Sequence, residues 1–202
     1  MSPTRTLLRT SGTAFRAMLV ATLALGLGYT LLITGVGQLL PGQAHGSPVT
    51  DARGTVVGSA LIGQSFTDAD GNALPQYFQS RPSAAGDGYD GGASSGSNWG
   101  PENADLIAAI EQRTTSIAER EGVDASQIPA DAVTASASGL DPHISVAYAE
   151  LQLARVADAR GLSTDEVESL VAENTTGRDL GYLGDPRVNV LQLNLALDAL
   201  GS

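Results

Sequence analysis

The residues most able to carry out chemistry lie within ten positions of one another. His143 is one of only two histidines in the chain, and Asp141 stands two positions before it. Ser136, Ser138 or Ser145 could serve as a nucleophile, so the block holds the residue types of a Ser–His–Asp hydrolase. Sequence neighbours rarely form a working triad, and no G-x-S-x-G elbow is present. The simpler interpretation is that Asp141 caps a helix and His143 makes a local hydrogen bond, with an extracytoplasmic hydrolase as the alternative.

Other catalytic or cofactor sites find less support. Residues 86–91 fit G-x-G-x-x-G, but they follow no predicted strand, open no predicted helix and include two aspartates, so we interpret them as a surface turn. Because the chain has no lysine, it can hold neither a GK[ST] phosphate loop nor a Ser–Lys dyad. No histidine spacing predicts a metal site. With 22 acidic and 11 basic residues, the chain is not expected to bind nucleic acid.

A charge-free segment over residues 17–44 predicts a membrane span. Its apolar part, 18–40, is longer than the roughly 20 residues that cross the hydrocarbon core of a bilayer. A cleaved signal peptide is the alternative, but its apolar region is shorter, and Gln-Ala-His-Gly at 43–46 is a poor cleavage site. We therefore predict a retained anchor that contacts membrane lipid.

The charges on either side of this segment predict its orientation. Only Arg5, Arg9 and Arg16 precede it, whereas 8 arginines and all 22 acids follow, a net charge of −14. Arginines beside a span stay in the cytoplasm. We predict a bacterial plasma-membrane protein with a cytoplasmic tail over 1–16, a transmembrane helix over 17–40 and an extracytoplasmic domain over 46–202.

Small residues recur along one side of the predicted span. At helical spacing they let a second helix approach closely, so they predict a packing face. The members of this stripe are Ala17, Ala21, Ala24, Gly28 and Gly35.

The remainder of the chain predicts an α+β domain with two or three strands and four helices. Strands are expected within 55–66 and at 132–136, and a long loop over 67–100. Helices are expected over 102–121, ending at Gly122, and over 142–160, begun by Asp141 as N-cap and Pro142. A capping box at Ser163–Glu166 opens a third helix, and 189–200 is the fourth.

Short motifs in a fixed order resemble one family over nearly the whole chain. They are TGVGQ at 34–38, QAHGS at 43–47, GSALIGQ at 58–64, RPS at 81–83, GSN at 96–98, VTAS at 133–136, SGLDPHIS at 138–145, ARG at 159–161 and PRVNVL at 186–191. Each is weak alone, but their order and the single leading span resemble the C subunit of the Kdp potassium-transporting ATPase. Ala137 and Ser95 replace glycines that are usual in that family.

The resemblance implies a non-catalytic accessory subunit of an ATP-driven potassium uptake pump. Its partners would be a channel-like potassium-translocating subunit, a P-type ATP-hydrolysing subunit and a small stabilising subunit, with K⁺ and ATP handled by the complex. Such subunits are described as raising the ATP affinity of the P-type subunit. A direct nucleotide role would fall on residues 134–145 or Gln152, yet an external domain lies across the membrane from ATP.

The same resemblance implies candidate contact residues, which are the polar members of the shared blocks and their surroundings. They are Gln64, Arg81, Ser97, Asn98, Ser138, Asp141, His143, Gln152, Arg187 and Asn189.

Overall fold

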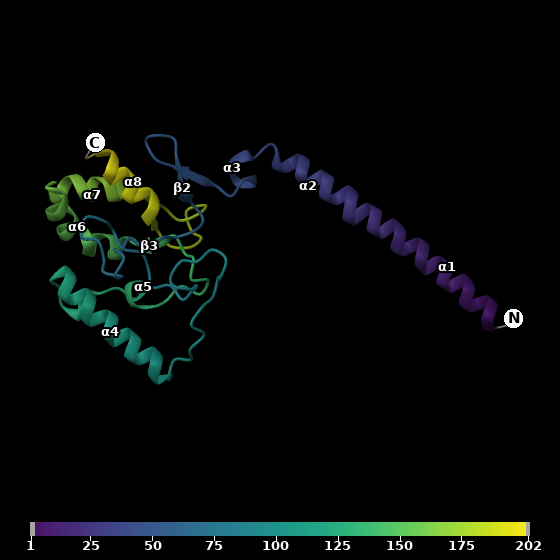
Figure 1. The fold of residues 1–202 in the computed structure, drawn as a ribbon, viewed down its shortest axis with the longest axis horizontal. Helices are drawn as coiled ribbons and strands as arrows, with labels where there is room; N and C mark the ends of the chain where they lie inside the picture. The colour runs from purple at the N-terminus through teal and green to yellow at the C-terminus, as the bar shows by residue number, and fades with distance from the viewer. Residues whose placement is uncertain (1–2, 201–202) are drawn as a thin grey trace. The chain divides into compact units, whose positions relative to one another are not determined.

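The computed structural model describes residues 3–200 of the 202-residue chain (Figure 1). It divides into a first unit, Met1–Ser47, and a second unit, Pro48–Ser202. Each unit has its own internal packing and is described separately below.

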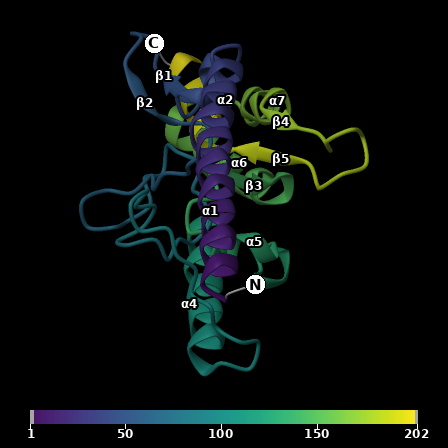
Figure 2. The same ribbon diagram turned by 90° about the vertical axis from the view of Figure 1, so that its right-hand side faces the viewer.

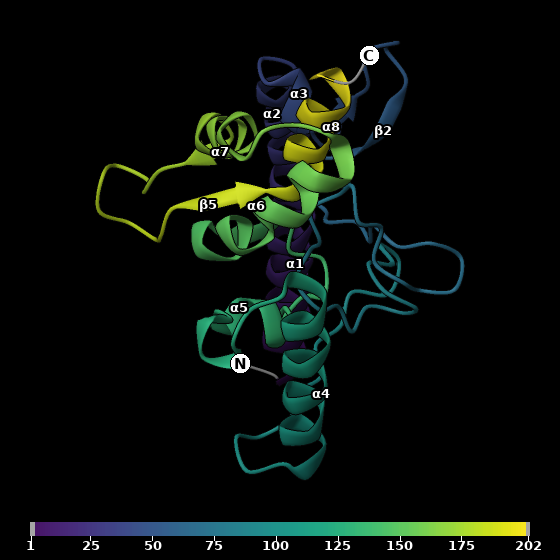
Figure 3. The same cartoon turned by 90° about the vertical axis from the view of Figure 1, so that its left-hand side faces the viewer.

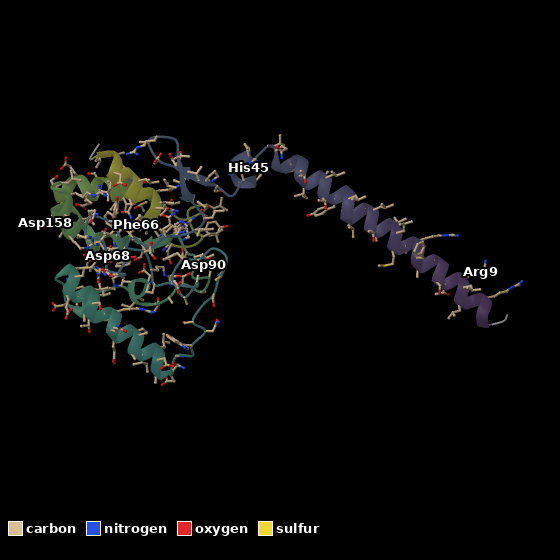
Figure 4. All side chains as sticks on the ribbon, viewed as in Figure 1. Arg9, His45, Phe66, Asp68, Asp90 and Asp158 are labelled. Carbon is tan, nitrogen blue, oxygen red and sulfur yellow. The ribbon has the colours of Figure 1, made fainter. Side chains whose placement is uncertain are left out.

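The first unit is almost entirely helical. Its elements are α1 (Pro3–Ala21), the π-helical η1 (Thr22–Tyr29), α2 (Thr30–Gly37) and the short α3 (Pro41–Ala44). Leu7–Gly37 is 31 residues long with a mean hydropathy of 1.9, and no part of its apolar window is buried. Among the described residues it is the one helix long and apolar enough to cross a membrane, as predicted. Figure 4 shows Arg9 near one end of this helix and His45 beyond the other.

The second unit contains short strands and longer helices. They are β1 (Pro48–Thr50), β2 (Val56–Ser59), α4 (Ala104–Glu121), the 3-10 helix η2 (Ala125–Gln127), α5 (Ala130–Val133), β3 (His143–Ser145), α6 (Val146–Arg160), α7 (Thr164–Glu173), β4 (Thr175–Thr176), β5 (Arg187–Asn189) and α8 (Val190–Leu200). β1 and β2 form an antiparallel pair, and a second antiparallel sheet has the order β3-β5-β4. The predicted α+β class is confirmed.

The main core forms where α6, α7 and α8 pack beside the three-stranded sheet, as Figure 3 shows. Ile144 and Val188 are paired across β3 and β5, and both are buried. Side chains on a strand alternate between its two faces, so these residues direct one face of the sheet into the core. Phe78, from the long loop, is also fully buried there.

Local signals explain the helix ends. The Asn103 side chain accepts from two backbone N–H groups at the start of α4, and Gly122 ends that helix with a φ of 68°. Ser163 and Glu166 form the predicted capping box of α7. Gly161 ends α6 in the same left-handed conformation as Gly122. The predicted stops at Gly122 and Gly161 and the predicted capping box are confirmed, and so is the last helix, Val190–Leu200, within one residue.

Two predicted elements are wrong. Residues 132–136 do not form a strand, because Ala130–Val133 make one helical turn after Pro129 and the following residues are irregular. Asp141 and Pro142 do not begin a helix either. The chain enters β3 first, and Ser145 caps α6 by accepting from the Tyr148 N–H at 3.0 Å. Pairing with β5, a tertiary effect, overrides the local helix-start signal.

Candidate functional site

Four of the predicted contact residues line one cavity of about 680 Å³ in the second unit. Arg81 reaches it from the long loop, Asp141 and His143 come from the entry to β3, and Arg187 comes from β5. Two arginines and an imidazole therefore share one hollow with three carboxylates, since Asp131 and Asp185 also line it, although 106 positions separate Arg81 from Arg187.

The register of the sheet produces this grouping. His143 pairs with Asn189 and Ser145 with Arg187, so these side chains lie on the face of the sheet opposite Ile144 and Val188. Asn189 is itself buried, whereas His143, Ser145 and Arg187 line the cavity. A helix beginning at Pro142, as expected from the sequence, would have rotated His143 away from β5. The short strand is therefore the element that creates the site.

Arg81 and Asp141 form its electrostatic centre. The Arg81 Nη1 donates to the Asp141 Oδ2 at 2.9 Å, and the Tyr89 hydroxyl donates to the Arg81 carbonyl at 2.7 Å. Burial raises the pKa of Asp141, but hydrogen bonds from His143 and the charge of Arg81 outweigh burial, so the pKa of this carboxyl lies below its ordinary value. Burial also raises the pKa of Tyr89 to about 12. At neutral pH Asp141 is thus ionised in the cavity, and the Tyr89 phenol that holds the Arg81 backbone is neutral.

The serine candidates for hydrolysis are engaged elsewhere. Ser145 donates to the Asp131 Oδ1 at 2.8 Å, and the hydroxyls of Ser136 and Ser138 lie 3.1 Å from each other. The Nδ1 of His143 lies 3.5 Å from the Asp141 Oδ1. In residues 3–200 no serine hydroxyl is hydrogen-bonded to the His143 ring, so a Ser–His–Asp arrangement is not assembled.

Three other predicted contact residues fix the fold from inside. Gln152 is fully buried, and its amide binds both backbone groups of Gln79. The Gln64 Nε2 donates to the Val57 carbonyl, and the Asn189 Nδ2 donates to the Ala60 carbonyl. These amides join the long loop to α6 and to β2, and the segment after β2 to β5.

The remaining predicted residues lie where the long loop meets residues 136–140. The Ser95 N–H and the Ser94 hydroxyl both donate to the Ser138 carbonyl, at 3.0 and 2.9 Å. Asn98 is exposed, and its side chain donates to the Gly96 carbonyl. Ser97 is half-buried beside them. Ser138 lines a second hollow of about 710 Å³ that shares Arg81 and Asp141 with the first.

Sequence reasoning missed two features of the second unit. The first is Glu121, whose side chain is 0 % exposed and pairs with Arg155 at 3.0 Å and Arg120 at 2.7 Å. In the sequence, Glu121 stands at the end of an amphipathic helix, where an acidic residue is expected to be exposed to solvent. The second is the exposed apolar tip between β4 and β5, which a cluster of Leu180, Tyr182 and Leu183 in a turn-rich segment could have indicated.

The described residues offer no obvious place for a metal ion, since no group of three or more His, Asp or Glu side chains is arranged to hold one in that part of the chain. The small-residue stripe lies on the helix of the first unit and spans η1. Ala17 and Ala21 lie in α1, Ala24 and Gly28 in η1, and Gly35 in α2.

Comparison with known proteins decides the family. The KdpC profile, described as the K⁺-transporting ATPase c chain, matches residues 11–199. The chain belongs to the KdpC family. The KdpC relatives named potassium-transporting ATPase KdpC subunit include one from Kineococcus radiotolerans, 53 % identical over 95 % of this chain and 94 % of the relative.

Further KdpC relatives carry the same name. One from Gemmatimonas aurantiaca is 56 % identical over 93 % of both chains, and one from Mycobacterium tuberculosis strain H37Rv is 50 % identical over 93 % of this chain and 96 % of the relative. The predicted family resemblance is therefore confirmed over the span and the α+β unit together.

Proposed function

We propose that this chain is a non-catalytic accessory subunit of a K⁺-transporting ATPase, needed to assemble and couple a pump whose catalytic site lies on another chain. The observation that carries this proposal is the 31-residue helix Leu7–Gly37, whose apolar window has no buried residue in the described part of the chain. An apolar surface of that size is stable only in lipid or against other membrane helices. Membership of the KdpC family supports the proposal. We propose that the partners are the channel-like, P-type and small stabilising subunits.

The charge distribution supports an external position for the second unit. Three arginines precede the span and the excess of acids follows it, which favours a cytoplasmic N-terminus. Protease added to intact cells would then degrade the α+β unit. Survival of that unit until the cells are opened would refute this orientation.

An external unit would influence turnover through its partners rather than by holding nucleotide. Gln152, a candidate for nucleotide contact, uses its amide on the Gln79 backbone and is fully buried. We propose that the unit covers the outer entrance of the channel-like subunit, where its acidic surface raises the local cation concentration. The ATP-affinity effect described for the family would then reach the P-type subunit indirectly.

The small-residue stripe would provide the helix-packing contact within the membrane. Gly28→Leu should reduce the recovery of partner subunits with the tagged chain, because a leucine prevents close approach of a second helix. Gly26→Leu is the matched control, since it makes the same change two residues away on another side of the helix. Within the chain, neither added Cβ meets an atom closer than 3.7 Å, so both variants should keep the helix intact. Equal recovery of partners with both variants would refute the Gly28 face.

A further inference from the structure

The loop between β4 and β5 carries the most exposed apolar group of the second unit. Leu180 is 81 % exposed, Tyr182 69 % and Leu183 48 %. Figures 2 and 3 show this loop projecting away from the helices of the unit. Single exposed leucines are ordinary, but three large apolar side chains within four residues form a patch that marks an interaction site.

The tip of this loop is held in a defined shape. The backbone groups of Asp179 and Leu183 exchange two hydrogen bonds of 2.9 Å. Two ion pairs join the sides of the loop, Arg178 with Asp185 at 3.1 Å and Arg187 with Asp179 at 3.4 Å. The patch is therefore presented by an ordered turn, which reduces the entropy lost on binding.

Leu180 itself adopts an unfavourable backbone conformation. Its φ is 54°, in the left-handed region that residues with a Cβ seldom occupy, and glycine or asparagine would fit there without strain. A solvent-exposed leucine at such a position contributes nothing to the core of the unit. Strain kept at an exposed position indicates that the side chain has a role outside the unit.

From these observations we infer that the tip formed by Leu180, Tyr182 and Leu183 docks into an apolar hollow on the outer face of another subunit of the same pump. This inference rests on the proposed function, and it names the surface through which the second unit binds its partner. The two ion pairs around the tip act as a polar rim that excludes water from the apolar contact.

The charges around the tip fit a protein partner better than a lipid surface. Segments that insert into membrane surfaces carry an excess of Lys and Arg, which attract anionic headgroups. Here Arg178 and Arg187 are neutralised by Asp185 and Asp179, so no cationic excess remains. The 22 acids against 8 arginines after the span would also oppose approach to an anionic surface.

The tip is continuous with the polar cavity described above. Asp185 and Arg187 belong to its ion pairs and also line the cavity with Arg81, Asp141 and His143. A partner that holds the apolar tip would therefore cover the cavity as well. The contact surface would combine an apolar anchor with a polar, charged flank, as protein interfaces commonly do.

The test uses the full-length chain, tagged and produced together with its partner subunits. Leu180→Asn removes the apolar side chain but tolerates the positive φ, so the turn should keep its shape. We expect at least about a tenfold weaker recovery of the partner subunits, because a buried leucine is worth more than a factor of ten in affinity. Ile107→Asn is the matched control, since Ile107 is 45 % exposed on α4 and lines neither the cavity nor the second hollow, and the recovery of partners with it should be unchanged.

A second readout does not depend on affinity. The chain has no cysteine, so Tyr182→Cys introduces a single thiol at the tip. A maleimide should label it at least tenfold more slowly in the purified complex than in the chain alone in the same detergent. Ile107→Cys, on α4 and away from both hollows, should be labelled at equal rates in the two samples.

The outcomes separate this inference from the proposed function. Normal recovery with Leu180→Asn, or equal labelling of Tyr182→Cys in both samples, would overturn the docking tip while wild-type recovery still supported a pump subunit. If Leu180→Asn left partner recovery unchanged but lost binding to anionic lipid vesicles, the tip would be a lipid contact. If it left partner recovery unchanged but lost self-association, the tip would bind a second copy of the chain. Either result would overturn the docking inference. If the wild-type chain recovered no pump subunit, the proposed function itself would fail.

Discussion

The buried amide of Gln152 offers the sharpest test of how the long loop is held. Its Oε1 accepts from the Gln79 N–H at 2.7 Å and from Arg155 at 2.8 Å, while its Nε2 donates to the Gln79 and Tyr148 carbonyls. Its exposed fraction is 0 %, so water cannot replace these partners. Asn194 holds the adjacent Phe78 by the same pair of backbone bonds.

Gln152→Leu keeps the approximate size of the side chain and removes all four hydrogen bonds. The N–H and carbonyl of Gln79 are then left buried without this partner, at a cost of about 1–3 kcal/mol each. The added apolar contact of leucine recovers part of this loss, so we expect a net destabilisation of about 2–4 kcal/mol. That is a large share of the roughly 5–15 kcal/mol that stabilises a typical domain. For a unit of this size it corresponds to a fall in Tm of roughly 4–16 °C.

Thermal unfolding and hydrogen exchange of the detergent-solubilised chain would measure both consequences. The Gln79 amide should exchange slowly in the wild type and quickly in Gln152→Leu. Gln112→Leu is the control, because Gln112 is exposed on α4 and its replacement should leave the Tm within about 2 °C. If Gln152→Leu were as stable as the wild type, or if the Gln79 amide stayed protected, the amide would not anchor the loop.

Two further predictions concern charge and backbone shape. Because the folded-state pKa of Asp141 lies below its ordinary value, its ionised form stabilises the folded state above pH of about 4, and this contribution is lost as the pH falls through the folded-state pKa. Asp141→Asn should therefore lower the free energy of unfolding by about 1 kcal/mol at pH 7, and the difference in Tm between this variant and the wild type should shrink as the pH falls. A difference in Tm that did not change with pH would contradict this prediction. Gly139 and Gly122 have φ values of 69° and 68°, but a Cβ at Gly139 would lie 2.6 Å from the Ser95 carbonyl oxygen, whereas one at Gly122 would meet no atom within 4 Å. Gly122→Ala should lower the free energy of unfolding by about 1 kcal/mol, and Gly139→Ala should lower it by at least about 2 kcal/mol more. Equal losses in the two variants on thermal unfolding would show that the close approach at Gly139 does not matter.

Features set by local chemistry were predictable from the sequence. The span follows from an apolar run whose length as a helix exceeds the thickness of the hydrocarbon core of a bilayer, a property that does not depend on tertiary contacts. Gly122, Gly161 and the Ser163–Glu166 capping box ended or began helices as expected, because caps act within four residues. The KdpC motifs likewise identified the family and most of the polar residues that line the cavity.

The grouping of those residues depended on contacts between distant segments. Strand β3 has three residues, too few to show an alternating pattern, and Asp141-Pro142 locally favours a helix start. Pairing with β5 decided the outcome and placed His143 and Arg187 on one face. The long loop appeared only polar and irregular, yet Gln152 and Asn194 bind its backbone at Phe78 and Gln79, which brings Arg81 to Asp141.

The sequence by itself therefore determined the family, a helix long and apolar enough to cross a membrane, and the helix ends marked by Gly122, Gly161 and the Ser163–Glu166 capping box. These features depend on motif order, hydropathy and capping along the chain. Only the tertiary structure decided that Glu121 and Gln152 lie inside, that four polar residues share a cavity, and that Leu180 stands in solvent. The physical reason is that burial and side-chain direction arise from pairing between segments far apart in sequence. The residue pattern of one segment does not specify which distant segment it will contact.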